Sequence, residues 1–150
     1  MKRVFVTLLA VFAVSGASAA SPARYEPGFQ EVLTALAQRS GISEDELRGL
    51  LSRCEVSQSA MNICAYRDVV AADLKLKHAV ASKVQQLPAC KERLEARIAR
   101  WEVARDQGCK RSAAKDYGGG SLERTAESMC AQHEIVRMTK QVERQRTCKQ

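Results

Sequence analysis

The chain is poor in the residues from which most enzyme sites and most large cores are built. Aromatic residues make up 5% of its 150 residues, and there are only two histidines, His78 and His133. Neither histidine belongs to a recognisable catalytic motif, and no Gly-x-Ser-x-Gly element occurs. We therefore expect a protein that is not an enzyme and needs no cofactor.

Cysteine pairs at metal-binding spacing are also missing. No Cys-x2-Cys or His-x3-His element occurs, and these are spacings with which proteins commonly hold zinc. The chain has six cysteines, an even number, which favours three disulfide bridges in an oxidising compartment. We expect no bound metal.

Long apolar runs are absent after the N-terminus. Residues 1–20 combine the basic Met1-Lys2-Arg3, an apolar stretch over residues 4–14 and the small residues Ala17-Ser18-Ala19, which is the pattern of a cleaved export signal. The alternative is a membrane anchor, but the stretch is shorter than the ~20 residues that span a bilayer. We expect no transmembrane segment in the mature chain and a periplasmic or secreted location.

Negative charge is in the minority, because 24 Lys and Arg residues oppose 17 Asp and Glu residues and give a net charge of +7. Both signs are interleaved, as in Lys91-Glu92-Arg93-Leu94-Glu95, which is typical of a solvated helical face and not of a nucleic-acid interface. The last fourteen residues are more one-sided. Their basic residues are Arg137, Lys140, Arg144, Arg146 and Lys149. We expect no nucleic-acid partner, and an anionic envelope surface is the alternative partner for this C-terminal basic face.

Four cysteines are placed symmetrically about Gly118-Gly119-Gly120-Ser121. Cys90 and Cys109 lie 19 residues apart before this run, and Cys130 and Cys148 lie 18 apart after it. Two helices that fold back on each other at the glycines would bring Cys109 to Cys130 and Cys90 to Cys148. The remaining two cysteines, Cys54 and Cys64, are then expected to pair with each other.

Apolar residues recur at helical spacing along the chain, and no strand alternation occurs. The expected helices run from Phe29 to just before Gly41, from a capping box at Ser43 to about Cys54, from about Asn62 to Leu87, from about Ala89 to Lys115 and, capped by Ser121, from about Leu122 to Arg146. On the last helix Leu122, Ala126 and Met129 fit one apolar stripe, and Ile135, Met138 and Val142 fit a slightly rotated one. The predicted fold class is all-α, a small bundle of antiparallel helical hairpins stapled by disulfides.

Two of the expected helices carry a charge where the stripe calls for an apolar side chain. The first is Asp73, and the second is Arg105. A hairpin that turns at Pro88 brings both to the same depth, beside Leu76 and Trp101, so that they form an internal ion pair. Alternatively, the two helices rotate enough to expose both charges.

Several short motifs resemble those of a known family. They are Cys54 with Met61-Asn62-Ile63-Cys64-Ala65, Ala72-Asp73-x-x-Leu76, Trp101-x3-Arg105-Asp106-x2-Cys109, and Gly119-Gly120-Ser121 followed by Cys130. Over about residues 54–145 the chain is similar to the lysozyme-inhibitor LprI-like family of bacterial secreted and envelope proteins. It departs from the family pattern at Lys77, Val80 and Ala104. The expected organisation is residues 1–20 as signal peptide, 21–53 as an N-terminal helical extension and 54–150 as the LprI-like helical domain.

The resemblance implies a small, helical, disulfide-bonded envelope protein. It implies that Trp101 belongs to the core, that Asp73 and Arg105 pair, and that Gly119 and Gly120 make a turn. Some members of the family bind and inhibit lysozyme, so the expected partner is a cell-wall hydrolase of lysozyme type.

The glycine run is the segment that we expect to meet such a partner. A glycine loop brings its flanking side chains close to another molecule, and a lysozyme cleft holds two carboxylates. The expected binding residues are Lys115, Tyr117, Gly118, Gly119, Gly120, Ser121 and Arg124. Alternatively, the glycines only make the turn.

Overall fold

The computed structural model describes residues 25–148, and every regular element within them is helical. In chain order the elements are α1 (Phe29–Ser40), α2 (Glu44–Leu51), α3 (Gln58–Gln86), the short 3-10 helix η1 (Pro88–Cys90), α4 (Lys91–Tyr117) and α5 (Glu123–Arg144). The all-α prediction is confirmed for this part of the chain. The expected signal peptide, residues 1–20, and Lys149 lie outside the described residues.

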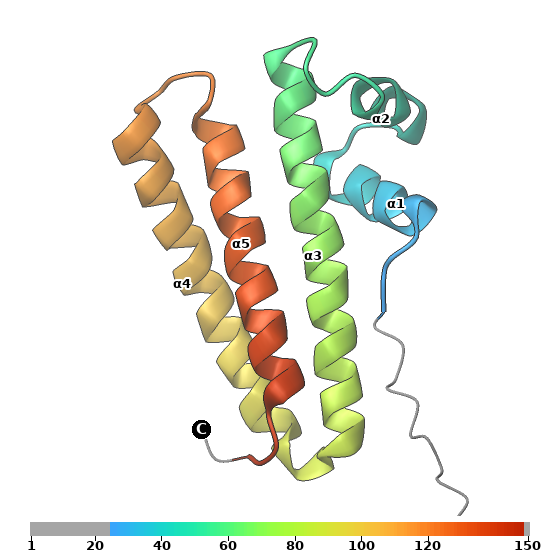
Figure 1. Ribbon diagram of the computed structural model, residues 1–150, viewed down its shortest axis with the longest axis vertical. Helices are drawn as coiled ribbons and strands as arrows, with labels where there is room; N and C mark the ends of the chain where they lie inside the picture. Colours follow the sequence, from blue (N-terminus) through green and yellow to red (C-terminus); the bar gives the residue numbers. More distant parts are fainter. Residues whose placement is uncertain (1–24, 149–150) are drawn as a thin grey trace, which may run out of the picture.

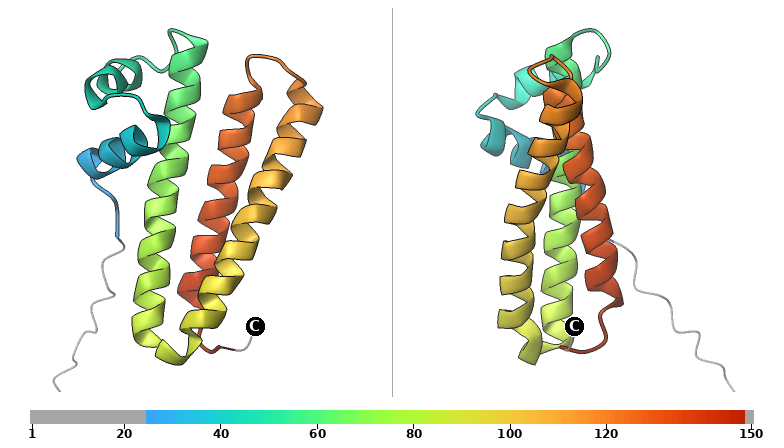
Figure 2. Two further views of the ribbon diagram at one scale, coloured as in Figure 1. Left: turned by 180° about the vertical axis from the view of Figure 1, so that it is seen from behind. Right: turned by 90° about the vertical axis from the view of Figure 1, so that its left-hand side faces the viewer.

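Three long helices form the larger part of the molecule (Figure 1). α5 packs along both α3 and α4, whereas α3 and α4 make few contacts with each other beyond the turn that joins them. The left view of Figure 2 shows α3 and α4 diverging from this turn, and the right view shows α5 lying to one side of both. The shared core consists of Val69, Ala72, Leu76, Leu94, Cys109, Ala131, Ile135, Met138 and Val142. α5 is thus the helix that holds the other two together.

The two short helices form a second, smaller core against the N-terminal half of α3. Its buried residues are Val32, Leu33, Leu36, Leu47 and Val70. Gly41 ends α1 in the left-handed conformation, with φ of 72°. The Ser43 hydroxyl caps α2 by accepting a hydrogen bond from the Glu46 amide at 3.3 Å. Gly41 thus ends α1 and Ser43 starts α2 as the sequence predicts, and both helices pack against α3.

α3 begins one turn earlier than predicted. Its first residue is Gln58 and not Asn62, because the Ser57 hydroxyl accepts a hydrogen bond from the Ala60 amide at 3.1 Å and forms an N-cap. Ser57 and the residues that follow it are therefore the cap and the first turn of the long helix.

α5 departs from the prediction in its cap and in its apolar stripe. It begins at Glu123 without a side-chain cap, so the predicted Ser121 cap is wrong. Leu122 and Met129 are 46% and 63% exposed, so the first of the two predicted stripes does not face the core. The bridge through Cys130 fixes the rotation of α5. The residues that α5 then buries are Ala131, Ile135, Met138 and Val142.

Three disulfide bridges close the fold, and they join the pairs that the spacing predicts. They are Cys54–Cys64, Cys90–Cys148 and Cys109–Cys130, with Cα–Cα distances of 5.9, 5.1 and 5.5 Å. The first closes the loop between α2 and α3. The other two lie at opposite ends of the α4–α5 hairpin, which is therefore held covalently at both ends.

Candidate functional site

The turn between α4 and α5 lies at the free end of their hairpin (Figure 1). We call residues 115–124 the hairpin tip. Gly119 has φ of 75°, a conformation that residues with a Cβ rarely adopt. A Cβ on Gly120 would lie 2.8 Å from the carbonyl oxygen of Tyr117. Glycine is thus required at both positions by the geometry of the turn itself.

The amides of the glycine run are all used within the turn. Those of Gly118 and Gly120 donate to backbone carbonyl oxygens at 2.9 and 2.7 Å. The Gly119 amide donates to Glu123 Oε2 at 2.7 Å. These three amides are therefore not available to donate to another molecule.

The side chains that flank the glycines are exposed. All seven residues predicted for binding lie at this turn on the surface of the molecule, namely Lys115, Tyr117, Gly118, Gly119, Gly120, Ser121 and Arg124. Tyr117 is 45% exposed. Neither Lys115 nor Arg124 has an ion-pair partner within residues 25–148. The hairpin tip thus offers two cations and a phenol, and its contact with a partner stays a prediction.

A second loop, Cys54–Cys64, lies at the same end of the molecule as the hairpin tip (Figures 1 and 2). The N-terminal turns of α3 and α5 are linked there, because Thr125 Oγ1 donates to Asn62 Oδ1 at 2.6 Å and Gln58 Nε2 lies 3.3 Å from Thr125 Oγ1. Val56 in this loop is 65% exposed. Sequence reasoning missed Val56 because a single valine carries no motif. Asn62, which bonds to Thr125 of α5, belongs to the family motif around Cys64, and that motif is the one sequence feature that draws attention to this contact.

Asp73 joins three helices in the interior. Arg105 Nη1 lies 3.4 Å from Asp73 Oδ1, so the expected ion pair is present, and the Arg105 side chain is only 9% exposed. The guanidinium of Arg105 also lies 5.1 Å from the centroid of the Trp101 ring. Arg39 of α1 adds a bond of 2.7 Å to Asp73 Oδ2. This cluster connects α1, α3 and α4, and its role in the fold is structural.

The basic residues near the C-terminus lie on the exposed side of α5 and beyond its end, but they do not form a purely cationic face. Arg137 pairs with Glu134 at 2.6 Å. Lys140 and Arg146 border a groove of about 840 Å³ between α3 and α5, and Glu143 lines the same groove. An anionic-surface partner for this face stays a prediction.

Within the described residues, no group of polar side chains is arranged for catalysis or for metal binding. His78 is exposed and stacks on Tyr25, with ring centroids 4.2 Å apart. Ser112 and Lys115 have the Ser-x-x-Lys spacing of some serine nucleophiles, but both are exposed on α4 with no hydrogen bond between them. Residues 25–148 contain no group of three His, Cys, Asp or Glu side chains that could hold a metal ion. In the same range, no helix combines the length and apolar character of a membrane span.

The family model described as lysozyme inhibitor LprI matches residues 52–142. This range begins just before the Cys54–Cys64 loop and contains α3, α4, the hairpin tip and nearly all of α5, whereas α1 and α2 lie outside it. No curated protein and no solved structure matches the chain. Because the matched range covers more than half of the chain and nearly all of the three-helix unit, the chain belongs to the lysozyme inhibitor LprI family.

Proposed function

We propose that this chain acts in the periplasm or outside the cell, where it binds and inhibits a cell-wall hydrolase of lysozyme type, and that it is not itself an enzyme. The observation that carries the proposal is the match to a family of lysozyme inhibitors over residues 52–142. Three disulfides and no free cysteine suit an oxidising compartment. An inhibitor needs a firmly held surface more than a reactive group, which agrees with this architecture.

The hairpin tip is the surface that we assign to the partner. Glycosidases of this kind use two carboxyl groups on either side of the bond that they cleave. Lys115 and Arg124 stand on opposite arms of the hairpin and are free to pair with such carboxylates, while Tyr117 adds an apolar ring and a hydroxyl. The nearby Cys109–Cys130 bridge holds the two arms together before binding. Less conformational entropy is therefore lost when the tip is ordered against a partner.

Charge limits which hydrolase is the preferred target. The chain carries a net charge of +7, and many lysozymes are basic as well, so long-range repulsion would slow their association. An acidic wall hydrolase would be attracted instead. We therefore expect the stronger inhibition with acidic enzymes and an association rate that falls as salt is added.

A cell-wall turbidity assay tests the proposal. The exported, fully oxidised chain is titrated against a panel of acidic and basic lysozymes and an amidase, and we expect at least one lysozyme to be inhibited at micromolar concentration or below. No inhibition of any enzyme at micromolar excess would contradict the proposed function.

Variants of the hairpin tip then test the site separately from the function. Tyr117→Ala and the double variant Lys115→Ala/Arg124→Ala should each weaken inhibition about tenfold, which corresponds to ~1.4 kcal/mol. Val103→Ala, 58% exposed on α4, and Arg100→Ala/Lys110→Ala are the matched controls outside the tip. If neither tip variant weakens inhibition more than its control, the contact with the hydrolase lies elsewhere on the molecule.

A further inference from the structure

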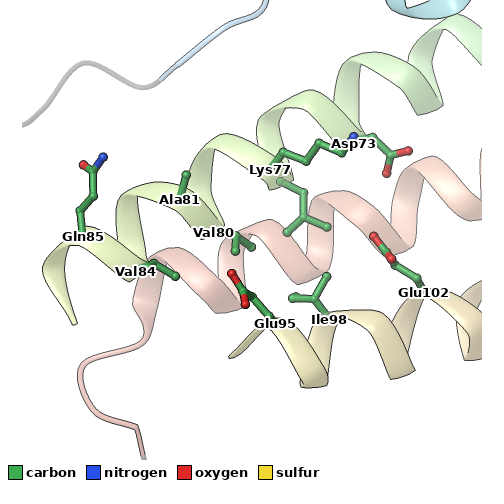
Figure 3. A pocket seen from close by; sticks show the side chains of 10 residues that line it. Asp73, Lys77, Val80, Ala81, Val84, Gln85, Glu95, Ile98 and Glu102 are labelled. Atoms are coloured by element: carbon green, nitrogen blue, oxygen red, sulfur yellow. The ribbon is translucent and has the colours of Figure 1, made fainter. Parts of the chain in front are cut away.

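A groove of about 410 Å³ runs between α3 and α4, and all its lining residues come from these two helices (Figure 3). It exists because α5 packs on both helices while α3 and α4 diverge from each other. Val80 and Val84 of α3 and Ile98 of α4 supply its apolar side chains, and each is only partly buried. The cluster around Asp73 marks one end of the groove.

Two carboxylates flank the apolar part of the groove. Glu95 and Glu102 lie three residues before and four residues after Ile98, so they share its face of α4 and rise from it toward α3 (Figure 3). Neither has an ion pair or hydrogen bond within residues 25–148. Asp73 is already paired with two arginines, and Lys77 is the one lysine that lines the groove. Beside its apolar strip the groove therefore presents two carboxylates, Glu95 and Glu102, on the surface of a chain whose net charge is +7.

We propose that this groove binds a cationic amphipathic helix. Along α3 it extends from Asp73 to Gln85, twelve residues or ~18 Å, which is room for about three helical turns. Glu95 and Glu102 are seven residues apart, or ~10.5 Å, which is the spacing of two turns. A helix with Leu, Ile or Val along one stripe and Lys or Arg seven residues apart beside it meets the apolar residues and both carboxylates together. Its docking would complete a four-helix arrangement around the diverging pair.

The groove and the hairpin tip are separate surfaces. The groove lies in the half of the bundle that is closer to the turn at Pro88, and the hairpin tip lies at the opposite end of α4 (Figure 1). The second surface does not rest on the proposed inhibition, so the two proposals succeed or fail independently.

A defined peptide provides the test. The probe is a fluorescein-labelled 14-residue helix with a leucine stripe and two lysines seven residues apart beside it, titrated with the intact oxidised chain by fluorescence anisotropy. We expect saturable binding. Glu95→Gln/Glu102→Gln should weaken it about tenfold, because both cationic contacts are lost. Ala81→Trp, which fills the groove from an exposed position, should weaken binding at least as much.

Two controls separate the groove from general charge attraction. Glu92→Gln/Glu55→Gln changes the net charge of the chain equally at exposed positions outside both the groove and the hairpin tip, and it should leave binding unchanged. A peptide of the same composition with its leucines scattered around the helix should not bind. The proposal is overturned if the amphipathic peptide fails to bind, if the scattered peptide binds equally well, or if neither groove variant weakens binding more than the control.

Discussion

At the scale of single residues, Asp73 is a side chain that links α1, α3 and α4. Its two carboxylate oxygens accept from Arg39 of α1 and Arg105 of α4, so one side chain on α3 ties three helices together. The Asp73 side chain is 15% exposed, which leaves water little opportunity to replace either partner. Removing it would leave the guanidinium of Arg105 largely buried without its carboxylate on α3.

Asp73→Ala should lower the free energy of unfolding by about 2–3 kcal/mol, somewhat less than the ~3–5 kcal/mol typical when one partner of a fully buried pair is removed. Urea denaturation of the oxidised chain measures it. Asp106→Ala is the control, because Asp106 pairs with Arg105 at 2.8 Å while being 62% exposed, and its loss should cost less than about 1 kcal/mol. Equal losses for the two variants would contradict a central role for Asp73.

This cluster also shows how far sequence reasoning reaches at the residue scale. Asp73 and Arg105 could be paired in advance because a hairpin at Pro88 fixes their relative depth. Arg39 could not, because its contact depends on how α1 crosses α3, and no periodicity within either helix encodes that crossing. The same holds for Val56 beside the hairpin tip, since exposure of a single valine follows from loop geometry and not from a pattern.

At the scale of secondary-structure elements, two glycines associated with α4 have opposite roles. Gly108 lies inside the helix, and an added Cβ would meet nothing within 4 Å. Gly120 lies in the hairpin tip, where an added Cβ would meet the backbone of Tyr117 at 2.8 Å. The first glycine costs helix stability without a steric reason, whereas the second is needed for the turn.

We expect Gly108→Ala to stabilise the chain by about 0.5–1 kcal/mol. Gly120→Ala should destabilise it by about 1–2 kcal/mol, because a backbone atom has to move. Thermal unfolding followed by circular dichroism measures both effects. If the hairpin tip binds the hydrolase, Gly120→Ala should also reduce inhibition and Gly108→Ala should not. A stabilised Gly120→Ala would show that the turn does not need its glycine.

The contact between α1 and α2 should be sensitive to acid. Thr34 Oγ1 and Gln30 Nε2 each donate to the Glu44 carboxylate at 2.7 Å. These two bonds, Thr34 first, lower the pKa of Glu44 below its usual 4.5, with a smaller contribution from Arg48. Since the folded state binds the proton less readily than the unfolded chain, the stability from this contact is complete above the usual pKa and is lost as pH falls through the lowered one.

Glu44→Gln tests this dependence. The difference in unfolding free energy between the wild type and the variant should favour the wild type at pH 7 and shrink steadily below about pH 4.5, the usual carboxylate range. Urea denaturation at a series of pH values measures it. Glu46→Gln is the matched control, because the Glu46 side chain accepts no hydrogen bond from a side chain within the described residues, and its difference from the wild type should not shrink in this way. A Glu44→Gln difference that does not vary with pH would contradict the assignment.

The ends and rotations of the helices were the least predictable features at this scale. The sequence does not reveal the cap at Ser57, because a polar Ser-Gln-Ser segment is equally typical of a link between two helices. The rotation of α5 was misjudged because Leu122 and Met129 fit a helical stripe as well as the residues that are buried. The bridge to Cys109 decides between the two registers, and that is a tertiary constraint.

At the scale of the whole molecule, the α4–α5 hairpin has one bridge near its tip and one at its base. They close segments with sequence separations of 21 and 58 residues. On the chain-entropy account, a longer closed segment gives the larger stabilisation. For function the order should be reversed, because the inner bridge lies closer to the residues that we assign to the partner.

Cys90→Ala/Cys148→Ala should therefore cost about 4 kcal/mol of stability and Cys109→Ala/Cys130→Ala about 3 kcal/mol. Inhibition, measured where both variants remain folded, should suffer more from loss of the inner bridge. Urea denaturation measures how much stability each double variant loses, and the turbidity assay measures how much inhibition each one loses. If loss of the outer bridge reduces both stability and inhibition more, inhibition does not depend on the Cys109–Cys130 bridge near the hairpin tip.

The fold class and the disulfide pairs could be predicted because both follow from spacing along the chain. The hairpin tip could be located for the same reason. The groove between α3 and α4 could not, because it arises where these two helices diverge while α5 packs on both of them. A helical stripe shows which residues are apolar, but it does not show which neighbour covers them.

The nesting of one bridge inside the other sets a condition on how the protein is made. A chain that is oxidised in the order in which it emerges presents Cys109 to Cys90 before Cys130 or Cys148 is available, and consecutive pairing would trap the wrong isomer. Within a formed α4 these two cysteines are ~28 Å apart and cannot react with each other. Early formation of α4 thus keeps these two thiols apart until Cys130 and Cys148 have been synthesised. A chain that is oxidised before α4 forms depends on a disulfide isomerase to rearrange the wrong bridge.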